Sequence, residues 1–152
     1  VEQAVATSQG VHGWLWRLRF TSAKGELALA RGAWEEAARL AEETIARSRR
    51  TGRLKYQARG LEIQARALVA LNRTQEAIAL LRNAVELVRA TGDPALFLRA
   101  AAVLLRLCDD EALFVEAQAR VRTIVQALRD EELIRRFLHA EIVSPLLSSG
   151  MQ

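Results

Sequence analysis

Apolar residues recur at intervals of three and four along most of the chain, and short polar or glycine-containing breaks separate the runs. This spacing places the apolar side chains on one face of an α-helix. The pattern is clearest in residues 61–88, where two such runs flank the polar break formed by Asn72, Arg73 and Thr74. It predicts an all-α fold in which helices pair across short turns.

The same pattern, extended along the chain, predicts about seven helices preceded by the end of a truncated one. The expected spans are 1–8 for the truncated helix, then 14–31, 34–50, 54–71, 74–90, 94–108, 111–129 and 131–144. Asn72 and Gln75 have the spacing of a capping box, and Asp93 followed by Pro94 is typical of a helix start. Pro145 is expected to stop the last helix near Ser144.

An internal repeat of forty residues organises these helices. Glu-Ala pairs and Thr-Gly pairs recur at that distance, at positions 36–37, 76–77 and 116–117 and at positions 51–52 and 91–92. A period of this length is typical of helical hairpins that bury their apolar faces by stacking on one another. It predicts three hairpins, about 14–52, 53–92 and 93–130, after a truncated helix and linker (1–13) and before a capping helix and tail (131–152).

The residues within each unit resemble the tetratricopeptide family. The matching positions are Gly25, Gly32, Glu36 and Ala37 in the first unit, and Ala65, Asn72, Glu76, Ala77 and Ala84 in the second. The third unit departs at Leu105 and Ile124. The period is longer than the family's usual length of about 34 residues, and it resembles the extended repeats of bacterial STAND-class ATPases and maltose-activator-like transcription factors. The resemblance implies a right-handed α-solenoid, and some of those regulators bind small effectors in such solenoids.

Composition narrows the functional classes. The 152 residues are 51% hydrophobic and carry a formal charge of +4, which comes mostly from arginine because Lys24 and Lys55 are the only lysines. This surplus permits contact with acidic partners or nucleic acid without requiring it. The single Cys108 excludes an intrachain disulfide, so a cytoplasmic location is expected. We expect no membrane span, because the most apolar stretch, 95–107, contains two arginines.

The sequence carries no recognisable catalytic or metal-binding signature. The sequence has no phosphate-binding GxxxxGK motif and no HExxH motif, and the spacing of His12 and His139 does not indicate a shared metal. We therefore expect no enzyme activity, no catalytic residue, no cofactor and no metal. Cys108 falls in an apolar row and is expected to be a buried, inert thiol. Trp14 and Trp16 either pack beneath a preceding helix or form an exposed contact surface.

An arginine row is the strongest functional signal in the sequence. Arg19, Arg59 and Arg99 are forty residues apart, and His139 continues the series. Seven residues further along each unit lie Glu26, Arg66 and Arg106, two helical turns away on the same face. One interpretation is a solvated face whose arginines pair with local acids such as Glu62, and the other is an anion-binding groove on the concave surface. Arg49, Arg89 and Arg129 also repeat, but helix-end electrostatics accounts for them.

These features together favour a binding module over an enzyme. We expect a tetratricopeptide-like interaction or sensor module of a larger bacterial regulator, acting in signal transduction or transcription regulation. Arg19, Arg59, Arg66, Arg99, Arg106 and His139 would bind an acidic protein or peptide partner, or a small anionic effector. The alternatives are nucleic-acid binding by the same arginines and a structural spacer that forms homo-oligomers; no membrane partner is expected. Since the chain begins with Val, we expect it to be part of a larger protein.

Overall fold

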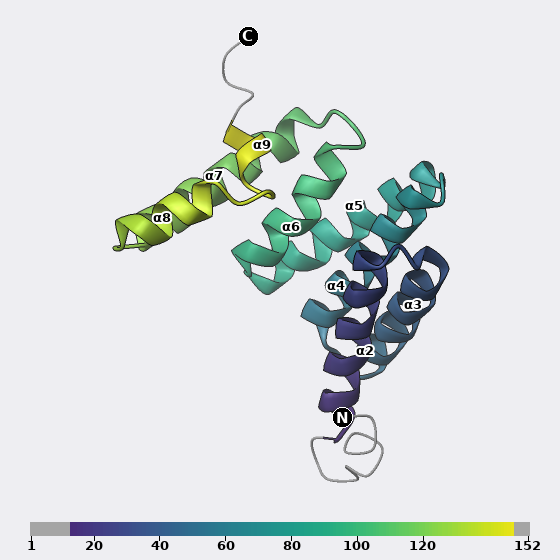
Figure 1. Ribbon diagram of the computed structural model, residues 1–152. Helices are drawn as coiled ribbons and strands as arrows, with labels where there is room; N and C mark the ends of the chain where they lie inside the picture. Colours follow the sequence, from purple (N-terminus) through teal and green to yellow (C-terminus); the bar gives the residue numbers. More distant parts are fainter. Residues whose placement is uncertain (1–12, 148–152) are drawn as a thin grey trace.

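The computed structural model describes residues 13–147, in which all regular secondary structure is helical (Figure 1). The predicted helix at 1–8 lies outside this range. None of the described helices is both long and apolar enough to cross a membrane. The helices are α2 (Gly13–Ala30), α3 (Trp34–Arg50), α4 (Leu54–Ala70), α5 (Thr74–Thr91), α6 (Pro94–Leu105), α7 (Glu111–Ala127), α8 (Glu131–Leu138) and α9 (Ser144–Leu147).

The forty-residue repeat reappears in the backbone of the turns. Gly32 and Asn72, forty residues apart, have φ angles of 74° and 60° after α2 and α4. Gly52 and Gly92, again forty apart, have φ angles of 64° and 65° after α3 and α5. Glycine and asparagine tolerate this left-handed conformation best, which explains why these residue types end the helices. The capping-box prediction at Asn72 was wrong, because the N-cap of α5 is Arg73 and no side chain caps it.

Aspartates begin the later helices. Asp93, Asp110 and Asp130 are the N-caps of α6, α7 and α8, and each carboxylate accepts a backbone N–H bond from the residue three positions on. Pro94 occupies the first helical position of α6, as predicted. This arrangement satisfies one of the N–H groups that every helix start leaves without an intrahelical acceptor.

The C-terminal region differs from the prediction. The helix expected over 131–144 ends at Leu138, residues 139–143 form a turn, and Pro145 lies inside α9 rather than ending a long helix. Val143 and Leu146 are each only 2% exposed and join the main apolar cluster. A straight helix would carry both side chains away from the core, so their burial outweighs continued helix formation.

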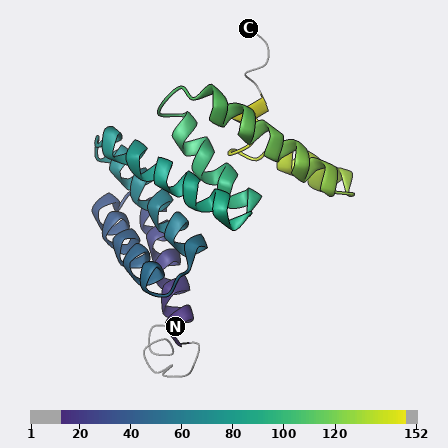
Figure 2. The same ribbon diagram turned by 180° about the vertical axis from the view of Figure 1, so that it is seen from behind.

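From α2 to α7 each helix packs against the next, and the first helices of successive units also touch. Neighbouring pairs run from α2 with α3 to α6 with α7, and α4 contacts both α2 and α6. Figures 1 and 2 show the chain advancing from α2 at one end of the molecule to α7, α8 and α9 at the other. The faces of α2, α4 and α6 therefore lie side by side.

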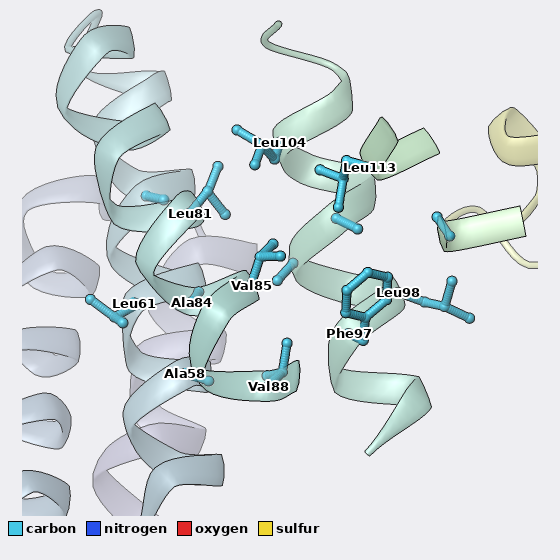
Figure 3. Close-up of a cluster of buried hydrophobic side chains, with 14 of the residues drawn as sticks. Ala58, Leu61, Leu81, Ala84, Val85, Val88, Phe97, Leu98, Leu104 and Leu113 are labelled. Atoms are coloured by element: carbon cyan, nitrogen blue, oxygen red, sulfur yellow. The ribbon is translucent and has the colours of Figure 1, made fainter. Parts of the chain in front are cut away.

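The main core lies around α5. Figure 3 shows Leu81, Val85 and Val88 of α5 between side chains of α4, such as Leu61, and of α6, such as Phe97. The repeated alanines Ala37, Ala77 and Ala117 are 0% exposed. Small side chains at these points allow neighbouring helices to approach closely, in agreement with the spacing of the Glu-Ala pairs.

Candidate binding face on helices α2, α4 and α6

The predicted arginines come together on adjacent helices. Arg19 lies on α2, Arg59 and Arg66 lie on α4, and Arg99 lies on α6, while Arg106 is the C-cap of α6. Because α4 touches both α2 and α6, equivalent positions forty residues apart become neighbours in space. We call the surface formed by these five arginines the arginine face.

Three of the arginines share two glutamates. Arg99 donates to Glu26 at 2.8 Å and to Glu62 at 2.9 Å. Arg66 reaches the same two carboxylates at 3.5 and 3.3 Å, and Arg59 donates to Glu26 at 3.3 Å. We call these five residues the charge network. It joins α2, α4 and α6 through side chains that lie up to 73 residues apart in the sequence.

Glu62 is the buried centre of the charge network. Its side chain is 5% exposed, whereas that of Arg99 is 30% exposed. Burial opposes the charge on Arg99, but the negative charges of Glu62 and Glu26 and their hydrogen bonds outweigh this effect and raise the pKa of the guanidinium above its ordinary value. Arg99 is therefore a charged, firmly held partner of two carboxylates, as the solvated-face interpretation with Glu62 anticipates.

Arg19 lies in a different environment at the exposed end of the row. Its Nε donates to the Tyr56 hydroxyl at 2.9 Å, and its guanidinium lies 5.4 Å from the centre of the Trp16 ring. Both partners are uncharged, so the positive charge of Arg19 is not neutralised by them. Trp16 itself is 56% exposed. The combination of a cation with an exposed indole ring and a half-buried phenol ring suits stacking as well as charge recognition.

Arg106 and His139 lie at the C-terminal ends of their helices, as the C-caps of α6 and α8. Arg106 contacts Glu141 at 3.8 Å, and the Glu141 side chain is 90% exposed, so this pair is weak. His139 follows the last residue of α8 as its C-cap and is exposed. Because α8 is short and α9 turns back, His139 does not occupy a mid-helix position like those of Arg19, Arg59 and Arg99.

Two adjoining hollows open on the arginine face, and Arg66, Val103 and Arg106 line both. The first, the charged hollow, has a volume of about 240 Å³ and contains Glu26, Glu62, Arg99 and Glu141. The second, the apolar hollow, has a volume of about 330 Å³. Its other lining residues are Leu29, Trp34, Val69, Ala70 and Leu107.

Sequence reasoning found most of the cations but missed several of their partners. Tyr56, Trp34 and Glu141 were not singled out, because their proximity depends on how hairpins stack and on the turn after α8. A signal for Glu26 was present, since it takes the position that arginine holds in the next two units. A change of charge sign at an equivalent position indicates an ion pair between neighbouring repeats.

A third hollow lies between α6, α7 and α9 and has a volume of about 550 Å³. Cys108 lines it and is half-buried rather than buried; its thiol donates weakly to the Leu104 carbonyl at 3.6 Å. Asp109 and Asp110 also line it, and the Asp110 carboxylate already accepts the Leu113 N–H as the N-cap of α7. Within residues 13–147, no three His, Cys, Asp or Glu side chains gather closely enough to hold a metal ion.

Comparison with protein-family models, with curated protein sequences and with solved structures found no match to this chain.

Proposed function

We propose that this chain is a non-catalytic interaction module, a right-handed solenoid of tetratricopeptide-like hairpins within a larger bacterial regulatory protein. The module binds an acidic protein or peptide, or a small anionic effector, across the arginine face. The stacking of α2, α4 and α6 supports the solenoid, as do the left-handed turn residues that recur at the repeat distance.

The observation that carries the proposal is an excess of guanidinium groups on one hollowed face. Arg19, Arg59, Arg66, Arg99 and Arg106 lie there, and the carboxylates that pair with them are Glu26, Glu62 and Glu141. A surplus of positive charge in a concave surface raises the local potential and attracts acidic partners. Arginine also binds carboxylates through two parallel hydrogen bonds, which gives the contact a defined geometry.

The arginines divide into two roles under this proposal. Arg99 is engaged at short distances by Glu62 and Glu26 and mainly holds the three helices together. Arg66 and Arg106 make longer contacts, and Arg19 has only uncharged partners among the contacts described above. These three are the groups that turn toward a partner at the least cost. His139 takes a lesser part, because it lies beyond α8.

Contact with single-stranded nucleic acid is the second candidate, and one observation favours it. Trp16 and Tyr56 lie beside Arg19, so aromatic rings and a cation meet at the α2 end of the face. Exposed rings next to arginine are the usual platform on which unpaired bases stack. Elsewhere on the face Arg59, Arg66, Arg99 and Arg106 pair with carboxylates, which compete with nucleic-acid phosphates for these guanidinium groups.

The test compares two double variants of the 152-residue chain for binding to poly-L-glutamate and to a single-stranded oligothymidine. Arg66→Gln/Arg106→Gln removes two groups of the arginine face, and Arg49→Gln/Arg82→Gln removes the same charge from exposed sites on α3 and α5. We expect the first variant to bind poly-L-glutamate at least about tenfold more weakly, since a hydrogen bond to a charged group contributes roughly 1.5 to 3 kcal/mol. The control should bind nearly as well as the wild type.

The other outcomes distinguish the remaining functions. Equal loss in both variants would show that net charge alone attracts the acidic chain, and the proposal would fail. Tighter binding of oligothymidine than of poly-L-glutamate, with a steep salt dependence, would favour the nucleic-acid function. A mass that rises with protein concentration in the absence of any ligand would favour the oligomerisation spacer.

A further inference from the structure

The two hollows of the arginine face differ in charge. The charged hollow contains Glu26, Glu62 and Glu141 together with Arg66, Arg99 and Arg106, so acids and bases balance there. Among the described residues that line the apolar hollow, none carries a carboxylate, whereas Arg66 and Arg106 contribute two positive charges. An anion in the apolar hollow therefore meets a local charge of opposite sign, and an anion in the charged hollow does not.

The rest of the apolar hollow is hydrophobic. Leu29 is 6% exposed, and Trp34, Val69 and Val103 are half-buried. These side chains come from the ends of α2, α4 and α6 and from the start of α3. The volume of about 330 Å³ is at the small end of the range for ligand pockets. Apolar walls with a few convergent polar groups are the usual composition of a small-molecule site.

The two arginines of the apolar hollow are the loosely held ones. Arg66 contacts its carboxylates at 3.3 and 3.5 Å, and Arg106 contacts the exposed Glu141 at 3.8 Å, compared with 2.8 and 2.9 Å for Arg99. Arg106 is exposed, and its contact with the exposed Glu141 is screened by solvent. Arg66 is also exposed, and when it turns toward a ligand Arg99 still holds the buried Glu62 at 2.9 Å.

The helix ends at this hollow do not cancel the positive charge. Helix C-termini carry a partial negative charge of about half a unit each. Here one carbonyl near the end of α2 and one near the end of α4 are hydrogen-bonded, because Ala33 N–H donates to the Ala28 carbonyl at 2.9 Å and Arg73 N–H donates to the Leu68 carbonyl at 2.8 Å. Two full charges on flexible side chains therefore dominate the local field.

We propose that the apolar hollow is a binding site for a small amphipathic anion, a monocarboxylate with an apolar body. The carboxylate pairs with Arg66 and Arg106, and the apolar body packs on Trp34, Val69 and Val103. This inference rests on the proposed function, because it names the effector class for the same arginine face.

The experiment titrates the full chain with octanoate and follows the Trp34 indole N–H by NMR. Octylammonium has the same apolar body with the opposite charge, and acetate has the carboxylate without the body. We expect octanoate to shift the Trp34 resonance in a saturable manner, and each of the other two probes to bind at least about tenfold more weakly. A response to octylammonium equal to that to octanoate would overturn the role of the two arginines.

Two variants test the location. Ala70 is exposed and lines the hollow, so Ala70→Phe should fill it without disturbing the core and should abolish octanoate binding. The matched control is Ala79→Phe, an exposed alanine of α5 outside the hollow, which should leave octanoate binding unchanged. Undiminished octanoate binding by Ala70→Phe would overturn the proposed site.

A parallel titration with poly-L-glutamate separates this inference from the proposed function. If wild-type protein binds poly-L-glutamate but not octanoate, the amphipathic-anion site is wrong and the acidic-partner function stands. If the protein binds neither probe, both are wrong.

Discussion

Glu62 shows why a single residue decides how the arginine row should be interpreted. A carboxylate with a 5% exposed side chain is stable only where positive charges and hydrogen bonds compensate for its lost hydration. Arg99 and Arg66 provide this compensation from α6 and α4. Arg99 thus contributes to the fold, and a loss of binding after its removal would not by itself identify it as a ligand contact.

The first prediction is that Arg99→Ala destabilises the protein by about 3 kcal/mol, because it leaves the buried carboxylate of Glu62 with only the longer contact from Arg66. Urea denaturation measures the free energy of unfolding. Adding Glu62→Gln should recover much of the loss, since the uncompensated charge is then removed. Equal stability of wild type and Arg99→Ala would show that the charge network adds nothing to the fold.

The arginines of the site and one of their partners, Glu62, could be predicted from the sequence, but the pairing across three helices could not. The forty-residue register brings Arg59 and Arg99 to one face because equivalent positions in stacked hairpins are neighbours. Arg99 and Glu26 are 73 residues apart, and their contact depends on side-chain conformations across three helices. Periodicity indicates which face a residue occupies and does not indicate which opposite charge it meets there.

Among the helices, the predicted bounds agree well where a turn residue such as glycine ends the helix. Trp34–Arg50 was predicted without error, and Gly32, Gly52 and Gly92 end helices with a left-handed backbone. The prediction failed after Leu138, where no glycine or aspartate marks the helix end and the burial of Val143 and Leu146 reverses the chain. Burial against a distant surface is not visible in a local pattern.

Gly60 of α4 lies where α3 and α4 approach each other closely. A Cβ atom added there would lie 2.8 Å from Cγ1 of Ile45 and 3.2 Å from the backbone oxygen of Ala41. Alanine favours a helix over glycine by about 1 kcal/mol, but the backbone oxygen cannot move aside without separating the helices. We expect Gly60→Ala to destabilise the protein by roughly 1 to 2 kcal/mol net, measured as the free energy of unfolding in urea.

Gly25→Ala is the matched control for Gly60→Ala. Its nearest contact would be Cγ2 of Ile63 at 3.3 Å, a side-chain atom that can shift slightly. The gain in helix propensity should offset this contact, so the stability should change little. If both variants had the same stability, the close approach of α3 and α4 at Gly60 would not be a constraint.

Across the whole molecule, packing weakens from the centre toward the C-terminal end. α5 contributes five buried residues to the core, whereas α8 contributes none. An ion pair joins α5 to α7: Arg89 of α5 donates to Glu116 of α7 at 2.6 Å, and this hydrogen bond lowers the pKa of Glu116 below its ordinary value. Arg89, which helix-end electrostatics was expected to explain, therefore also connects α5 to α7.

The decrease in buried residues from α5 to α8 predicts that the helices open independently. Amide hydrogen exchange should be slowest in α4 and α5, whose buried faces must separate before exchange, and fastest in α8, where opening exposes little apolar surface.

Arg89→Gln should accelerate exchange in α7 and leave α3 unchanged, whereas Arg82→Gln, which replaces an exposed arginine of the same helix α5, should alter neither. Exchange measured by mass spectrometry at neutral pH keeps Glu116 ionised, because its lowered pKa places protonation below the ordinary carboxyl range. Protection of α8 equal to that of α5 would mean that the chain unfolds as one cooperative unit, and the independent opening proposed for its C-terminal end would be wrong.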